Sequence, residues 1–177
     1  APSRGHAPRD QEVEMLYYHT DEAIRLIMEN DELAEFAGGV STTEEIARAE
    51  ERLGVEFPPS YRRFLEQLGA GRFGAQVFFG LSEAAGHSEW DVVHHTLDRR
   101  EHSNLGGTTV VVGPYGEEAF FILDCARPGD DDECPVAEVP AGYSDIEEPN
   151  YFEDNFGRFI YARVCDVLGK PGDFSHP

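Results

Sequence analysis

Residues 42–81 contain paired start and stop signals for two consecutive helices. Ser41 or Thr42 can cap the first helix, with a glutamate three residues later to return the bond, and Gly54 supplies the left-handed residue that ends a helix. Pro58-Pro59 suits the first turn of a second helix, where a missing amide donor costs nothing. This segment therefore predicts a helix–turn–helix unit around which the other elements must pack.

The remaining apolar patterns alternate between strand-like and helical segments. Strands are expected at residues 76–79, 108–112, 119–123 and 134–139, and further helices at residues 88–102 and 151–168. Residues 113–116 have the composition of a turn, so the strands on either side should form a hairpin. Helices at both ends and strands clustered between them indicate an α+β domain, with a largely antiparallel central sheet flanked by helices.

Several motifs in residues 42–81 occur in a fixed order. They are Glu50-x-x-Leu53-Gly54, Phe57-Pro58-Pro59-x-Tyr61-x-x-Phe64-Leu65, the glycines Gly69 and Gly71, and Phe79-Gly80-Leu81. Together they resemble the signature of the SUKH superfamily, which includes yeast cell-wall-assembly regulators, bacterial Syd and many immunity proteins of bacterial toxin systems. Weaker similarity continues through residues 110–113, 122–124 and 134–136 and Phe156. Gly69-Ala70-Gly71 replaces the Asn-Gly-Gly usual in the family, so no role of that Asn can be transferred to this chain.

The resemblance and the periodicity together suggest three segments packed as one globular unit. Residues 1–10 mix Pro, Gly and charge without periodicity and are expected to be a flexible lead. Residues 11–40 form a helical N-terminal extension, which either packs on the domain or serves as a partner-binding arm, and residues 32–37 continue it as a helix or a broken turn. Residues 41–177 are the SUKH-like domain.

The charge of the chain limits its partners. The 35 acidic residues and 14 basic residues give a net charge of −21. A direct nucleic-acid binder is disfavoured because it would approach a polyanion of its own sign, so the expected partner is a basic protein. No apolar run is long enough for a membrane helix and no signal region begins the sequence, so a cytoplasmic location with no membrane partner is expected. The three cysteines lack metal-ligand spacing and are expected to be reduced thiols.

The sequence offers little support for catalysis, and neither an enzyme activity nor a cofactor is expected. His94, Asp98 and His102 share one helix face, but two helical turns spread them too far apart for one zinc ion. Residues 130–133 are acidic enough to attract calcium, but they lack the ligand spacing of a calcium loop. Both sets are therefore interpreted as solvated side chains.

The most distinctive feature is an accumulation of acid between Glu117 and Asp154. This segment contains thirteen acidic residues and one basic residue, Arg127, with aromatic residues interleaved. Aromatic anchors beside a charged rim are typical of a protein-binding surface, although a soluble acidic surface over packed tyrosines would have the same composition. The candidate partner-binding residues are Glu117, Glu118, Asp130, Asp131, Asp132, Glu133, Tyr143, Asp145, Glu147, Glu148, Tyr151, Glu153 and Asp154.

The resemblance implies a non-catalytic domain that binds another protein. Bacterial members of the superfamily are chiefly immunity proteins, so this chain is expected to bind and neutralise a cognate toxin with a basic, nuclease-type C-terminal domain. The charge agrees with this expectation, because a nuclease must be basic to hold its polyanionic substrate. The alternative is an intracellular regulatory scaffold that binds endogenous proteins, as the yeast relatives do.

Overall fold

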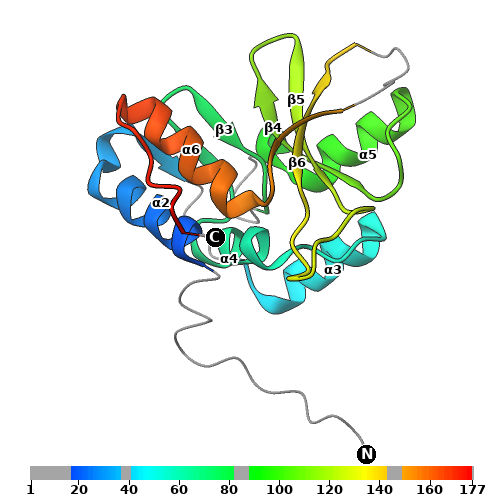
Figure 1. Cartoon of the computed structure of the whole chain (residues 1–177). Coiled ribbons are helices and arrows are strands. Elements are labelled where there is room, and N and C mark those ends of the chain that lie inside the picture. The colour runs from blue at the N-terminus through cyan, green and yellow to red at the C-terminus, as the bar shows by residue number, and fades with distance from the viewer. Residues whose placement is uncertain (1–16, 37–40, 82–87, 143–148, 177) are drawn as a thin grey trace, which may run out of the picture.

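The structure, a computed structural model, describes residues 17–36, 41–81, 88–142 and 149–176 (Figure 1). The helices in this part of the chain are α2 (Tyr18–Glu29), α3 (Thr43–Leu53), α4 (Pro59–Gln67), α5 (Val92–His102) and α6 (Phe156–Leu168), with 3-10 turns η1 (Asp31–Leu33) and η2 (Ser88–Trp90). The strands are β1 (Ala34–Phe36), β2 (Gly71–Phe73), β3 (Gln76–Phe78), β4 (Thr109–Tyr115), β5 (Ala119–Asp124), β6 (Val136–Pro140) and β7 (Asn150–Glu153). The predicted α+β class is confirmed.

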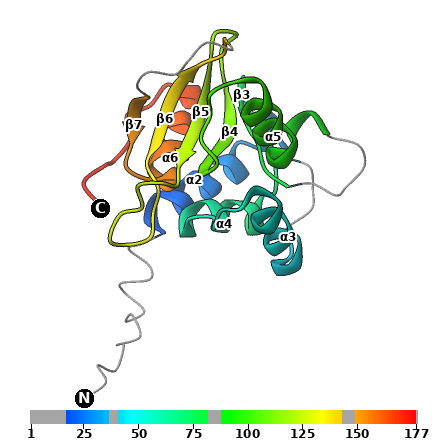
Figure 2. The same ribbon diagram turned by 90° about the vertical axis from the view of Figure 1, so that its right-hand side faces the viewer.

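The strands form two antiparallel sheets in sequence order, β1-β2-β3 and β4-β5-β6-β7. The sheets adjoin, because the amide of Phe79 donates to the carbonyl of Val112 at 2.8 Å. Figure 2 shows α6 behind the four-stranded sheet, α5 beside β4 on the other face, and α3 with α4 across one end. No helix in the described segments is long and apolar enough to cross a bilayer.

The helical unit predicted from residues 42–81 is present. Thr42 accepts a hydrogen bond from the Glu45 amide and Glu45 bonds back to the Thr42 amide, which completes the capping box of α3. Gly54 ends α3 with φ of 66°, and Pro59 occupies the start of α4. The buried hydroxyl of Tyr61 then donates to the Phe79 carbonyl at 2.8 Å, which fixes α4 against the end of β3.

The three-stranded sheet differs from the prediction in two ways. Residues 34–36 pair as β1 instead of continuing as a helix or a broken turn, and β2 starts at Gly71, where no strand was predicted. The close pairing explains that glycine, because a Cβ on Gly71 would lie 2.3 Å from the Glu35 carbonyl oxygen. Both strands have three residues, too short for an apolar alternation to be visible in the sequence.

The predicted hairpin of the four-stranded sheet is present, but its turn lies further along the chain. Gly113, Pro114 and Tyr115 belong to β4 and pair with β5, so the connection is at residues 116–118. Pro114 is tolerated because a register shift between Val111 and Gly113 disturbs the regular ladder there. Residues 113–116 therefore have the composition of a turn, but the first three of them continue the pairing of β4 with β5.

The predicted helix at residues 151–168 begins later. Residues 150–153 form β7, in which Tyr151 pairs with Ala137 of β6, and the side chain of Asn155 caps α6 by accepting from the Arg158 amide at 2.8 Å. The apolar residues of this segment fit a helical face only from Phe156 onward. Similarly, the helix predicted at residues 88–102 begins later, at Val92, and the side chain of Asp91 caps α5.

The core joins the N-terminal helix to the rest of the molecule. Phe64 of α4 packs against Phe156 with ring centroids 5.3 Å apart, and Phe159 packs against Phe121 of β5 at 4.7 Å. Helix α2 lies along α6, where Gly157 approaches Thr20 so closely that a Cβ would lie 2.5 Å from its hydroxyl oxygen. This helix is part of the predicted 11–40 extension. The boundary expected at residue 41 stays a prediction, and the predicted lead 1–10 lies outside the described residues.

A candidate protein-binding surface

The loop between β5 and β6, residues 125–135, carries the densest acidic run and is called the acidic loop below. A turn closes it, since the Asp132 amide donates to the Gly129 carbonyl at 3.1 Å and the Gly129 amide donates to the Glu133 carbonyl at 2.7 Å. Asp132 adopts a left-handed φ of 62°, which Asp tolerates better than most residues. The side chains of Asp130, Asp131 and Asp132 are exposed at the tip of this turn.

Glu133, next to this tip, is buried, and its interpretation as part of a solvated acidic surface is wrong. It is only 3% exposed and lies at the N-terminus of α4. Its two carboxylate oxygens accept from the amide of Ser60 at 2.8 Å and from the Ser60 hydroxyl at 2.7 Å. A hydrogen-bond acceptor is needed there, because the first amides of a helix have no partner within the helix. Glu133 therefore holds the acidic loop in place and is removed from the candidate contact residues.

Ser60 also links Glu133 to a second helix. The Ser60 hydroxyl oxygen also accepts from the amide of Gly157, in the first turn of α6, at 3.2 Å. Burial raises the pKa of Glu133 above its ordinary value, and the two bonds from Ser60 oppose this effect. The loop is thus fixed to the N-termini of two helices by one buried polar cluster.

Strand β7 places two large aromatic side chains beside the acidic loop. Tyr151 is 43% exposed and Phe152 is 40% exposed. The Tyr151 hydroxyl donates to Asp124 at 2.6 Å, a bond that raises its pKa, and the Arg127 guanidinium lies 5.8 Å from the ring centroid. Phe152 points to the opposite face, where its ring lies 5.6 Å from that of Phe121. Each ring therefore contacts neighbouring side chains and remains partly open to solvent.

The structure separates the candidate residues into two groups. In an antiparallel sheet, alternate connections lie at opposite ends, so the β4–β5 turn with Glu117 and Glu118 is remote from the acidic loop (Figure 2). Glu153, opposite Val136 in the register, and Asp154 lie at the loop end. Glu153 forms an ion pair with Arg158 at 3.2 Å, whereas Asp154 is exposed. Four further candidates lie outside the described residues: Tyr143, Asp145, Glu147 and Glu148.

We call the exposed set at the loop end the acidic end of the sheet. It consists of Asp130, Asp131, Asp132, Tyr151, Phe152 and Asp154. Phe152 was not among the predicted contact residues, although it is one of the aromatic residues interleaved with the acidic run. Because β7 is an edge strand of its sheet, side chains on both of its faces are partly open to solvent.

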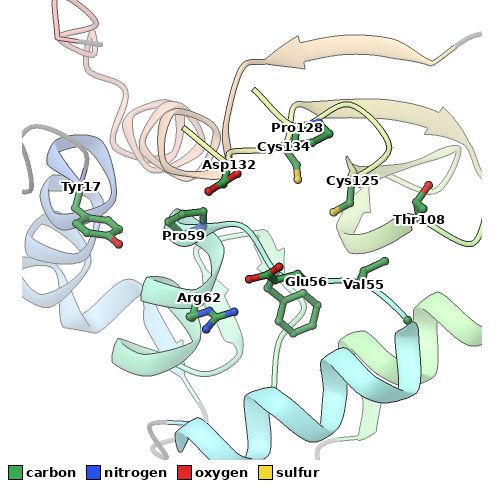
Figure 3. Close-up of a pocket in the computed structure, with 12 residues that line it drawn as sticks. Tyr17, Val55, Glu56, Pro59, Arg62, Thr108, Cys125, Pro128, Asp132 and Cys134 are labelled. Carbon is green, nitrogen blue, oxygen red and sulfur yellow. The ribbon is translucent and has the colours of Figure 1, made fainter. Parts of the chain in front are cut away.

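A pocket of about 600 Å³ opens between the acidic loop and the α3–α4 connection (Figure 3). Its lining includes Glu56, Arg62, Cys125, Asp132 and Cys134. Arg62 is engaged by Glu50 at 3.0 Å. The described part of the lining has thiols but no histidine, so it contains no thiol–imidazole pair of the kind that activates a catalytic cysteine.

The histidines of α5, which include the candidate metal ligands, make contacts other than metal binding. His102 lies 2.9 Å from the Asp98 carbonyl of its own helix, and His95 stacks on Phe79 with ring centroids 3.9 Å apart. Within the described segments, no three His, Cys, Asp or Glu residues are placed to hold a metal ion. The chemistry available at the acidic end is therefore that of charge, hydrogen bonding and aromatic contact.

The family relationship follows from comparison with known proteins. The family model described as SMI1-KNR4 cell-wall, SUKH_5, matches residues 20–161, beginning within α2. A solved structure, the crystal structure of a protein from Pseudomonas syringae pv. tomato, has a similar fold with a TM-score of 0.52 at 12% identity. The similarity covers 76% of this chain and 92% of that chain, and at this identity it concerns the fold alone. Because the family model spans most of the sequence, the chain belongs to the SMI1-KNR4 cell-wall family of the SUKH superfamily.

Proposed function

We propose that this chain is a non-catalytic, cytoplasmic immunity protein that binds a cognate toxin with a basic, nuclease-type domain. The observation that carries the proposal is the acidic end of the sheet, where three exposed aspartates lie on a fixed loop and the half-exposed Tyr151 contacts Asp124 and Arg127 at the base of that loop. Membership of a family with protein-binding members supports a protein partner.

The fixed position of the loop favours binding. A flexible loop loses conformational freedom when it is ordered at an interface, which reduces affinity. Here the bonds from Ser60 to Glu133 order the loop before any partner arrives, and the Asp131 carboxylate accepts from the Glu133 amide at 3.1 Å. The aspartates at its tip are therefore presented in one arrangement.

The charge of the chain indicates the kind of partner. The net charge of −21 produces a long-range attraction for a basic protein, and the three aspartates concentrate that charge at one place. Opposite charges raise association rates and contribute to partner choice. A nuclease domain fits this requirement, because its own substrate is a polyanion and its substrate-binding surface is therefore basic.

The aromatic residues supply contact area that the carboxylates cannot. Rings of tyrosine and phenylalanine lose little conformational entropy on binding and recur among the residues that dominate interface energies. Tyr151 and Phe152 present opposite faces of the same edge strand, so a partner that reaches both must wrap around β7. Tyr143 stays a predicted anchor.

The test is binding of the purified chain to the C-terminal domain of a toxin encoded beside its gene. Replacing Asp130 and Asp132 with Asn removes two charges and retains side-chain shape, so the association rate should fall roughly three- to tenfold at low salt and depend less on salt. The matched control is Glu117→Gln with Glu118→Gln, which removes two charges from the other end of the sheet.

Equal effects of the two double variants would mean that net charge, and not the acidic end, controls association. Unchanged rates in both would contradict electrostatic steering altogether. A neighbouring gene that encodes no toxin, together with capture of an endogenous protein that depends on Asp130 and Asp132, would favour the regulatory scaffold.

A further inference from the structure

Cys125 and Cys134 occupy directly opposed positions at the ends of β5 and β6. The register pairs Leu123 with Val136, and the Asp124 amide donates to the Pro135 carbonyl at 2.9 Å, so the next pair outward is Cys125 with Cys134. The Cys125 amide donates to Thr108 on the other side, at 3.0 Å. The cysteines therefore form a non-hydrogen-bonded cross-strand pair.

This kind of pair suits a disulfide. Opposed residues at a non-hydrogen-bonded position have Cα atoms about 4.5 Å apart, the closer of the two spacings in an antiparallel ladder. Disulfides span Cα separations of roughly 4.4 to 6.8 Å. The backbone of β5 and β6 thus places the two thiols within bonding range without a rearrangement of the strands.

Both thiols border a pocket that a small molecule can enter. Cys125 is half-buried and Cys134 is only 3% exposed, but both line the pocket of about 600 Å³, and Figure 3 shows them at the two ends of the acidic loop. Cys165 differs, because it lies within α6 and is not part of that lining. The chain therefore contains one pair at the pocket wall and one thiol away from it, which serves as an internal reference.

The two thiols also influence each other. A side-chain hydrogen bond between them lowers the pKa of Cys134 and raises the pKa of Cys125. A thiolate is the reactive form of cysteine, and each sulfur is the nearest reaction partner of the other.

We propose that Cys125 and Cys134 are a redox-active pair that forms a reversible disulfide when the protein meets a peroxide. One of the two sulfurs attacks one peroxide oxygen, the O–O bond breaks, and the products are a sulfenic acid on that cysteine and one water. The sulfur of the other cysteine then attacks the oxidised sulfur, the S–O bond breaks, and the hydroxyl leaves as a second water with the proton of the attacking thiol. Two thiols and one peroxide thus give one disulfide and two waters.

The disulfide would close a short covalent ring around the tip of the acidic loop. Residues 126–133, between the two cysteines, contain the three exposed aspartates and Glu133. The pocket admits a small oxidant or reductant to both sulfurs, which suits a bond that forms reversibly. The inference concerns the oxidation state of this loop and does not depend on any partner.

The test treats the reduced full-length chain with hydrogen peroxide, followed by alkylation in denaturant and peptide mapping without reductant. The expected product is a peptide linked through Cys125 and Cys134, lighter by two hydrogen atoms, with the count of free thiols falling from three to one. Dithiothreitol should restore all three thiols. Cys165 should remain free for alkylation.

Single substitutions assign the roles. Cys165→Ser should leave the crosslink unchanged. Cys125→Ser and Cys134→Ser should each abolish the crosslink, and the variant that keeps the sulfur attacked by peroxide should stop at a sulfenic acid that dimedone traps. Circular dichroism checks that each variant is folded, and the result for the natural chain stands without them. Three thiols that persist under peroxide, or a linkage that involves Cys165, would overturn the proposal.

Discussion

Residues 42–81 and residues 117–154 differ in what their distinctive side chains do. In the first segment the distinctive residues are structural, as when Tyr61 bonds to the Phe79 carbonyl or Gly80 packs against Gly69. Among the residues of the second segment that the structure describes, most distinctive side chains point to solvent, and Glu133 is buried. Stability and binding are therefore expected to be separable by mutation, with Glu133 affecting stability more strongly than the exposed aspartates of the acidic loop.

The largest expected effect is in the first segment, at Gly80. A Cβ at this position would lie 1.8 Å from the Gly69 carbonyl oxygen, an overlap with backbone that no side-chain movement relieves. Gly80→Ala should therefore lower the free energy of unfolding by more than about 4 kcal/mol, or prevent folding. Urea denaturation followed by circular dichroism measures this change.

Gly107→Ala is the matched control. No atom lies within 4 Å of a Cβ built there, so its effect should stay within about 0.5 kcal/mol. If Gly80→Ala is as stable as Gly107→Ala, the backbone at Gly80 does not approach the Gly69 carbonyl as closely as the structure shows.

The next effect concerns Glu133 in the acidic segment. Glu133→Ala leaves the buried Ser60 amide and hydroxyl without their acceptor, which should cost about 2–3 kcal/mol of stability. Asp130→Ala, three positions away and exposed, should change stability by less than about 0.5 kcal/mol. Thermal denaturation of both variants distinguishes the two roles, and similar melting temperatures would contradict the burial of Glu133.

Glu133 should also make stability depend on pH in a definite direction. Burial raises its pKa in the folded protein above the ordinary value of 4.5, so the folded state holds the proton more tightly than the unfolded state. The resulting stabilisation is complete below pH 4.5 and is lost as the pH rises through the folded pKa.

The Glu133→Gln variant resembles the protonated carboxyl and cannot titrate. Its stability relative to the natural chain should therefore increase from pH 4 to pH 7. Denaturant midpoints of both proteins across that range give the difference. A constant difference, or one that changes in the opposite direction, would contradict a raised pKa at this position.

The smallest expected effect is at Tyr151. Tyr151→Phe removes the hydrogen bond to Asp124 at a half-exposed position, so stability should fall by less than about 1 kcal/mol. Tyr115→Phe is the control, because Tyr115 has similar exposure and its hydroxyl has no hydrogen-bond partner among the described residues. A larger loss at Tyr115 than at Tyr151 would show that the bond to Asp124 contributes nothing.

Pairing between distant residues explains where expectations from sequence failed. Pro114 and Tyr115 have turn composition, yet they extend β4 because β5 offers Phe120 and Ala119 as partners. Similarly, residues 150–153 fit the end of a helical pattern and instead pair with β6. Local composition described the residues correctly in both cases, but the neighbouring strand determined their conformation.

The position of Glu133 could be anticipated only in part. Pro58 precedes α4 and has no side chain able to cap it, so the sequence implies that the Ser60 amide requires an acceptor from elsewhere. Nothing in the sequence identifies which of the many acids supplies it. Glu133 is 73 positions away from Ser60, and only the folded chain brings the two together.

The sequence by itself determined the helical unit of residues 42–81, the α+β class and the family, because caps, left-handed glycines and apolar periodicity act over a few residues. The tertiary structure alone decided which acids are exposed, which one is buried, and that Cys125 faces Cys134. These properties arise from contacts between segments far apart in the chain. The physical reason is that burial and register depend on packing, which the local sequence does not encode.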